Sequence, residues 1–361
     1  MVKYKTMQKA VLVRSLLLAA TVVLVFGSEW VHYPAAQETS GIHVTQDDLE
    51  IRISTSAIEA VIHKQGYVSG VYKGSFLDKE TGFRDVGFGL DVVDWLMEPG
   101  SGQAQPATAN TAFTGHGSYL TDGSIPWRNV EGPQICTKAK KISTAVIEGK
   151  NFVAVNENFR YYLPAPGKKS GSLWSQTIVF PAGKRYFISS DRIETVNSSD
   201  GLFLRIDMPG HIIHHHGDTF SEVYLSYFGD QYGIIPSSEF MSDFPPSEKF
   251  IYSRGQVEIP KRFIRAYHLR DPQTGRSGPW LAGMTLDPKV VYQAWCHERG
   301  YVCLIEEIGG RPVKPKDSFS AAYIVGFFDS IQEMNEVYDK YAGAVGLEVD
   351  THGWRLINSS R

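Results

Sequence analysis

The sequence predicts a mostly β protein, an antiparallel β-sandwich with one helix near its C-terminus. Three observations support this fold class. Aromatic residues make up 12% of the 361 residues, and aromatic and β-branched side chains fit pleated surfaces. Short runs alternate apolar and polar residues with a period of two, as in residues 42–62, which is typical of half-buried strands. Turn sequences rich in Gly, Pro, Asn and Asp separate these runs at short intervals, as in sandwiches and barrels.

The predicted strands follow this alternation in chain order. They are expected within residues 42–62, 66–76, 88–100, 145–163, 172–207, 256–271, 280–286, 300–310 and 318–328. Turns are expected at residues 78–82, 181–184, 197–201 and 208–210. The apolar run at 88–100 fits either a strand or a short helix, because periodicity alone does not separate the two. Residues 211–260 are more polar and less regular.

One segment has the period of a helix. Apolar residues recur there at spacings of three and four, at Ile331, Met334, Val337, Tyr338 and Tyr341. Ser330 precedes them and is a candidate N-cap. We therefore expect one late helix.

The N-terminus has the pattern of an export signal. Lys3, Lys5, Lys9 and Arg14 precede an apolar run at residues 15–27, which is shorter than the roughly 20 residues of a membrane-spanning helix. We expect residues 1–27 to be removed, with residue 37 as the latest cleavage point, and an uncleaved signal anchor is the alternative. The remaining 38–361 would form a single β-sandwich domain with a long loop near 99–133, exported to a periplasmic or extracellular location and free of the membrane after cleavage.

Charge and cysteine content exclude several classes of protein. The formal net charge is −3, so the chain lacks the basic footprint of a nucleic-acid-binding protein. Three cysteines are too few for a disulfide scaffold. Cys296 and Cys303 would be able to pair in an oxidising compartment, but we favour three free, buried thiols. The sequence has no zinc-finger spacing, nucleotide-binding loop or serine-hydrolase elbow, and it predicts no metal ligands and no particular cofactor.

The middle of the chain resembles a known superfamily. A strand with Trp174 and Gln176, a turn, a strand starting near Arg185 and a strand ending in an aspartate resemble the sheets of galactose-mutarotase-like super-sandwiches. This superfamily includes aldose epimerases and the sandwich domains of polysaccharide lyases and glycosidases. The resemblance implies an antiparallel β-super-sandwich and a carbohydrate ligand. It carries over no catalytic residue, and a fold alone does not define a function.

A histidine-rich segment is the first candidate site. It contains His211, His214, His215, His216 and Asp218. Imidazoles transfer protons near neutral pH and ligate metals. On a strand, His214 and His216 would share one face. The alternative is a polar loop with solvated histidines.

A basic segment at residues 261–270 is the second candidate. If it is a strand, Arg265 and Tyr267 share a face. In uronate β-elimination, Arg265 would neutralise the sugar carboxylate while Tyr267 or a histidine removes the C5 proton. The alternative is a solvated basic face on an edge strand.

Two further sets contain acids. Trp295 would stack on a sugar ring, and His297 and Glu298, with Arg262, would orient it; Trp295 as a core residue is the alternative. Asp91, Asp94 and Glu98 include candidates for the acid and base of glycoside hydrolysis.

These observations favour an exported carbohydrate-active enzyme, lyase-like or hydrolase-like, that acts on a polysaccharide fragment. The predicted catalytic residues are His214, His216, Tyr267 and Arg265. An aldose epimerase-type isomerase and a non-catalytic carbohydrate-binding or structural domain are the alternatives. An enzyme site requires the three segments 211–218, 261–270 and 295–298 to meet.

Overall fold

The computed structural model describes residues 41–65, 70–100, 127–245 and 248–359. Ser40–Arg361 forms one compact unit. The predicted signal segment and the middle of the predicted 99–133 loop lie outside the described residues. Among the described helices, none has the length and apolarity needed to cross a membrane.

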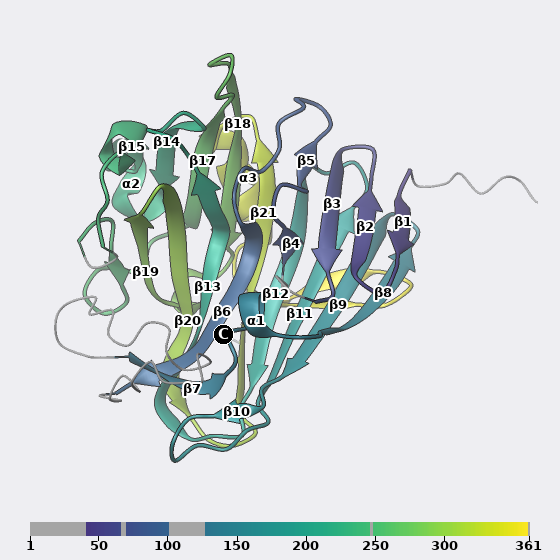
Figure 1. Ribbon diagram of the computed structural model, residues 1–361, viewed down its shortest axis with the longest axis vertical. Helices are drawn as coiled ribbons and strands as arrows, with labels where there is room; N and C mark the ends of the chain where they lie inside the picture. The colour runs from purple at the N-terminus through teal and green to yellow at the C-terminus, as the bar shows by residue number, and fades with distance from the viewer. Residues whose placement is uncertain (1–40, 66–69, 101–126, 246–247, 360–361) are drawn as a thin grey trace, which may run out of the picture. The chain divides into compact units, whose positions relative to one another are not determined.

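A nine-stranded antiparallel sheet is the largest layer of the unit (Figure 1). Its strands, in spatial order, are β15 (Ile234–Pro236), β14 (Phe220–Leu225), β17 (Phe263–Arg270), β18 (Ser277–Thr285), β21 (Ser318–Phe328), β12 (Tyr186–Glu194), β11 (Leu173–Pro181), β9 (Phe152–Arg160) and β8 (Ser143–Gly149).

Two further antiparallel sheets pack against this one. The eight-stranded sheet contains β10 (Leu163–Pro164), β7 (Trp127–Gly132), β6 (Gly89–Pro99), β13 (Ser199–Ile213), β20 (Tyr301–Val313), β19 (Val291–Glu298) and β16 (Tyr252–Ser253), with β4 (Val71–Tyr72) beside β6. The four-stranded sheet contains β1 (His43–Gln46), β2 (Glu50–Ser54), β3 (Ile58–His63) and β5 (Leu77–Asp78). A two-stranded ribbon is formed by β22 (Ala344–Val349) and β23 (Trp354–Asn358).

One buried apolar cluster lies between the sheets and joins them. It includes Ile53 of the four-stranded sheet, Leu204 and Leu304 of the eight-stranded sheet, and Val155 and Ile193 of the nine-stranded sheet. Alternate residues of each strand contribute to it, because successive side chains of a strand point to opposite faces. The predicted antiparallel β-sandwich is therefore confirmed.

A second apolar cluster covers the other face of the nine-stranded sheet. Met334 and Tyr338 of α3 (Ile331–Tyr341) pack there with Leu347 of β22. The Ser330 side chain accepts a hydrogen bond from the Glu333 N–H at 3.1 Å, so the predicted late helix and its N-cap are confirmed. The other described helical segments have three or four residues each: α1 (Ile135–Lys138), α2 (Gly229–Tyr232), η1 (Ser226–Phe228), η2 (Ser237–Phe240) and η3 (Pro288–Val290).

The turn predicted at residues 208–210 is a bulge inside β13. The pairing of β13 with both β20 and β6 shifts register between Asp207 and the residues that follow Pro209, and the strand then continues to Ile213. A Cβ at Gly210 would lie 2.0 Å from the carbonyl oxygen of Gly89, so only glycine fits there. The sequence signals for a turn therefore mark a bulge. Residues 127–132, at the end of the segment predicted as a loop, form β7.

Candidate functional site

The histidine-rich segment is not a continuous strand. β13 ends at Ile213, and the backbone then turns through His216, whose φ is 53°, and Gly217. His214 is buried, whereas His216 is exposed, so the two do not share a face. The Nδ1 atom of His214 accepts a hydrogen bond from the Gly217 N–H at 2.9 Å, and its Nε2 lies 3.1 Å from Oε1 of Glu298. His214 thus closes a turn against a buried carboxylate.

Arg265 and Tyr267 share one face of β17, as expected, and that face points into the core. The Tyr267 hydroxyl lies 2.9 Å from the Gly210 carbonyl oxygen and 3.1 Å from that of Val302, and burial raises the pKa of this phenol well above its usual value. Arg265 is fully buried and donates to Oε2 of Glu306 at 2.9 Å. Both side chains therefore connect the two large sheets, and β17 is an interior strand rather than an edge.

The predicted substrate-binding residues are divided among different surfaces. Arg262 forms an ion pair with Asp339 of α3, with Nε 2.7 Å from Oδ1. Trp295 and His297 lie on the face of β19 that points away from the sandwich core, whereas Glu298, one residue further, lies on the other face beside His214. The three predicted segments are adjacent in space, but they do not direct these side chains to one place.

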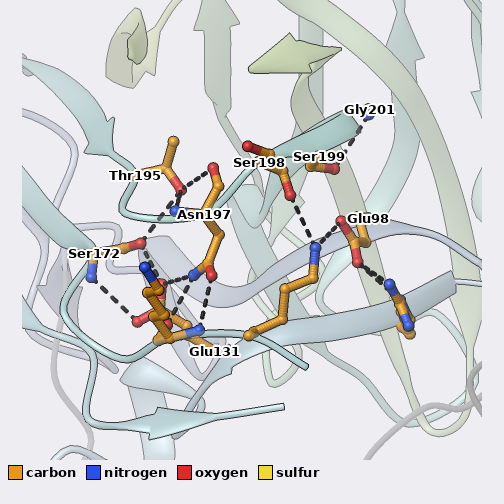
Figure 2. Close-up of polar contacts among 11 residues, drawn as sticks. Glu98, Glu131, Ser172, Thr195, Asn197, Ser198, Ser199 and Gly201 are labelled. Atoms are coloured by element: carbon orange, nitrogen blue, oxygen red, sulfur yellow. Dashed lines mark hydrogen bonds and ion pairs between the residues drawn. The ribbon is translucent and has the colours of Figure 1, made fainter. Parts of the chain in front are cut away.

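The acids of β6 are divided in the same way. Glu98 accepts from Nε of Arg128 at 2.8 Å and from Nζ of Lys168 at 2.7 Å, and Lys168 also donates to the Ser198 carbonyl oxygen at 3.0 Å (Figure 2). These ion pairs give Glu98 a structural role. Asp91, by contrast, is fully buried and close to Ser189 of the nine-stranded sheet, so the two acids do not lie in one site.

Glu131 makes a second network in the same region. Its carboxylate accepts from the Gly171 N–H at 2.7 Å and from the Asn197 side-chain amide at 2.8 Å, and it also contacts the Ser172 hydroxyl (Figure 2). These bonds attach β7 to the start of β11 and to the segment before β13.

The outward face of the eight-stranded sheet gathers polar and aromatic residues from several strands. Figure 1 shows β6, β13, β20 and β19 side by side. Residues directly opposite each other on paired strands share a face. Three cross-strand rows follow from the pairing of β13, β20 and β19: Arg205–Glu307–Gln293, Asp207–Ile305–Trp295 and His211–Cys303–His297. We call this surface, with Trp95 and Trp127, the tryptophan face.

Three indole rings are buried on the tryptophan face. Trp95, Trp127 and Trp295 are at most 3% exposed, and the Nε1–H of each has no hydrogen-bond partner among the described residues. Trp127 packs edge-on against Phe203, with ring centroids 4.7 Å apart. The Arg205 guanidinium lies 5.1 Å from the Trp295 ring centroid. Indole N–H groups usually find a partner when buried, and within the described part of the chain none is present for these three.

An arginine–glutamate pair lies at the centre of this surface. Arg205 donates from Nη2 to Oε1 of Glu307 at 2.6 Å and from Nε at 3.0 Å. The second oxygen of Glu307 has no hydrogen-bond partner within the described part of the chain. Burial raises the pKa of Glu307 to about 7, although Arg205 opposes this shift. The carboxyl therefore exchanges a proton near neutral pH.

Two aspartates and a histidine surround this pair. Burial raises the pKa of Asp207 to about 7 and lowers that of His211 to about 4. Asp94 accepts from Gln134 and from the Cys136 thiol, whose Sγ lies 3.2 Å from Oδ1, and burial and then the charge of Asp207 raise the pKa of Asp94. Near neutral pH the face thus combines a neutral imidazole with carboxyls that are partly protonated.

The rim of the tryptophan face is accessible to solvent. The His211 side chain is 13% exposed, and His297, Tyr301 and Phe88 are also partly exposed.

Sequence reasoning placed Trp295 and His297 in a site, and both belong to this face. It missed Arg205, Asp207 and Glu307. The available signal was a pair of charged residues two positions apart in the apolar strand at 202–208, since residues i and i+2 share a face.

The disulfide between Cys296 and Cys303 that the sequence left open does not form. All three cysteines are free and buried. Cys296 packs in the core between the sheets, whereas Cys303 lies on the tryptophan face.

No protein-family model and no curated protein matches this sequence. Solved structures with a similar fold exist. A candidate aldose 1-epimerase from Klebsiella pneumoniae has a TM-score of 0.43 and 8% identity, covering 81% of this chain and 82% of its own. Galactose 1-epimerase from Lactobacillus acidophilus has a TM-score of 0.41 and 8% identity, covering 80% and 98%. A GH36 α-galactosidase from Geobacillus stearothermophilus has a TM-score of 0.40 and 10% identity, covering 80% of this chain and 41% of the α-galactosidase.

Similarity at this level describes strand arrangement and does not identify a reaction.

Proposed function

We propose that this protein is a carbohydrate-active enzyme that binds its sugar at the tryptophan face and acts by proton transfer. One observation carries the proposal. A single sheet face brings together three indole rings, an arginine–glutamate pair, two aspartates and a neutral histidine.

The aromatic part suits a sugar. The C–H faces of a pyranose pack against indole rings, while its hydroxyl oxygens accept hydrogen bonds from Nε1–H groups. The Nε1–H groups of Trp95 and Trp295 have no partner among the described residues. A bound hydroxyl would supply the missing acceptors.

The ionisable part suits acid–base catalysis. A catalytic acid or base works best when its pKa is near the operating pH, and burial raises the pKa of Glu307 to about 7. Isomerisation of an aldose at C1 requires one group that protonates the ring oxygen and another that removes the anomeric hydroxyl proton. Glu307, whose Oε2 has no hydrogen-bond partner among the described residues, and Asp94 are the candidates for these two roles. We therefore propose an epimerase-type isomerisation, the interconversion of the anomers of an aldose, as the leading reaction.

Glycoside hydrolysis is the second candidate. Its support is the proximity of Asp94 and Asp207, since the charge of Asp207 raises the pKa of Asp94, and glycosidases use two carboxyls in different protonation states. Uronate elimination has less support, because Arg205 is already paired with Glu307.

The test is a panel of freshly dissolved aldoses and oligosaccharides, followed by polarimetry for anomer interconversion and by reducing-end release. Glu307→Gln should lower kcat by roughly a hundredfold, the scale for losing a general acid or base, with a smaller effect on KM. Glu336→Gln, at an exposed position of α3, is the control and should leave kcat unchanged. Turnover by Glu307→Gln at the parent rate, or absence of both activities across the panel, would refute the proposal.

A further inference from the structure

Three side chains of the tryptophan face place metal-ligand atoms close together. Asp207 and His211 belong to β13 and Cys303 to β20, and one ligand atom from each lies within 4.8 Å of the others. Nε2 of His211 is 3.5 Å from Oδ2 of Asp207, and Sγ of Cys303 is 3.2 Å from Oδ1 of Asp207. Around a tetrahedral zinc ion, with bonds of about 2.0–2.3 Å, neighbouring ligand atoms lie about 3.3–3.8 Å apart. The two separations to Asp207 are close to that range, and the ligand atoms of His211 and Cys303 lie no more than 4.8 Å apart.

The bulge in β13 creates this proximity. In a regular strand, residues four apart are separated by roughly 13 Å, too far to share an ion. Here Asp207 pairs with Ile305 and His211 pairs with Cys303, so four residues of β13 span only two residues of β20. The extra residues bulge out, and His211 returns to the face beside Asp207.

The ligand set and its surroundings are suited to a divalent transition metal. Thiolate, imidazole and carboxylate are the three donor types that zinc uses. Cys303 is 1% and Asp207 3% exposed. Phe88 and Tyr301 contact the His211 ring, with centroids 5.4 and 5.3 Å away. Packed side chains lose little conformational entropy when an ion binds.

We propose that Asp207, His211 and Cys303 bind one divalent transition-metal ion, with zinc as the best match to the donor set. The carboxyl of Asp94 lies within electrostatic range of Asp207 and Cys303. Three protein ligands leave a fourth position for water or a substrate oxygen, as in catalytic rather than structural zinc sites. The ion would polarise that oxygen.

Metal binding is measured on the full chain without any sugar, so its result is separate from that of the proposed function. The protein is stripped with a chelator, reloaded with zinc, and freed of excess metal by gel filtration. Elemental analysis should then give one zinc per chain. Replacement by cobalt should give the thiolate-to-metal charge-transfer absorption of a cysteine ligand.

Matched variants identify the ligands. Cys303→Ser should abolish the charge-transfer band, and His211→Asn should weaken zinc binding by at least tenfold. Cys296→Ser, in the core, and Cys136→Ser, beside Asp94, should keep the band. Circular dichroism of the metal-free variants checks that they are folded. If Cys303→Ser is unfolded, the zinc affinity of His211→Asn decides whether these residues bind the metal. Zinc content near zero in the reloaded protein, or loss of the band in Cys136→Ser but not in Cys303→Ser, would overturn the assignment.

Discussion

Three acidic side chains lie in the core between the two large sheets, and they should make the stability of the fold fall as pH rises. Asp91 of β6, Glu157 of β9 and Asp191 of β12 are all 0% exposed. None forms an ion pair with a described cation. Burial, followed by the charge of Asp91, raises the pKa of Glu157 to about 8, and burial raises that of Asp91 to about 7.

The sign of the effect follows from proton linkage. Between the unfolded pKa of Glu157, 4.5, and its folded pKa, about 8, the native state holds a proton that the unfolded chain has lost. The free energy of unfolding therefore decreases as pH rises through this window, by about 1 kcal/mol per pH unit for this one group, and levels off above it. The native state is therefore most stable at the acidic end of the window, where the Glu157 carboxyl is protonated.

Glu157→Gln removes the titrating group and keeps the shape of the side chain. Urea unfolding of the parent should show a midpoint that falls between about pH 5 and about pH 8, and the variant should show a visibly shallower fall. Glu148→Gln, at an exposed position on neighbouring β8, should retain the parent slope. Parallel pH dependences for the parent and Glu157→Gln would refute the reasoning, whatever their absolute stabilities.

Three other predictions concern the core, the ligand and export. Tyr267→Phe should cost about 1–3 kcal/mol of stability, because the single hydroxyl proton that the buried carbonyls of Gly210 and Val302 share is lost, and should leave sugar turnover intact; lost turnover at unchanged stability would contradict its place in the core. Trp295→Ala should weaken sugar binding measured by calorimetry at least fivefold, whereas Trp354→Ala on β23 should not, and equal effects would remove Trp295 from the site. Mass spectrometry of protein made with residues 1–27 should show loss of about 27–37 residues, and intact Met1 in a membrane fraction would indicate an anchor.

The strands and the helix were predictable because their signals are local. Alternation in β2 and β3 reports which residues face the core, and the spacing of Met334 and Tyr338 reports the buried side of α3. The N-cap at Ser330 was predictable for the same reason, since an N-cap side chain bonds a backbone N–H in the first turn of its own helix.

The site was less predictable because its members meet across strands. Asp207, Ile305 and Trp295 form one row only after the register of three strands is set, and a shift of one residue would turn each side chain to the other face. The bulge before His211 adds a local change that alternation cannot anticipate. With a strict period of two, the partner of His211 on β20 would lie four residues from the partner of Asp207. In the structure the two partners, Cys303 and Ile305, are only two residues apart.

The adjacent acids Glu306 and Glu307 show why clusters of charge in the sequence did not locate the site. Consecutive residues of β20 point to opposite faces, so Glu306 enters the core and pairs with Arg265 at 2.9 Å, while Glu307 points outward and pairs with Arg205 at 2.6 Å. Each glutamate thus needs its own arginine from a different strand. The basic segment around Arg265 supplies the partner for the structural glutamate, and the strand of Arg205 supplies the partner for the one at the proposed site. Charged residues that are neighbours in the sequence therefore have separate roles here, and it is the face of the strand that determines which role each one has.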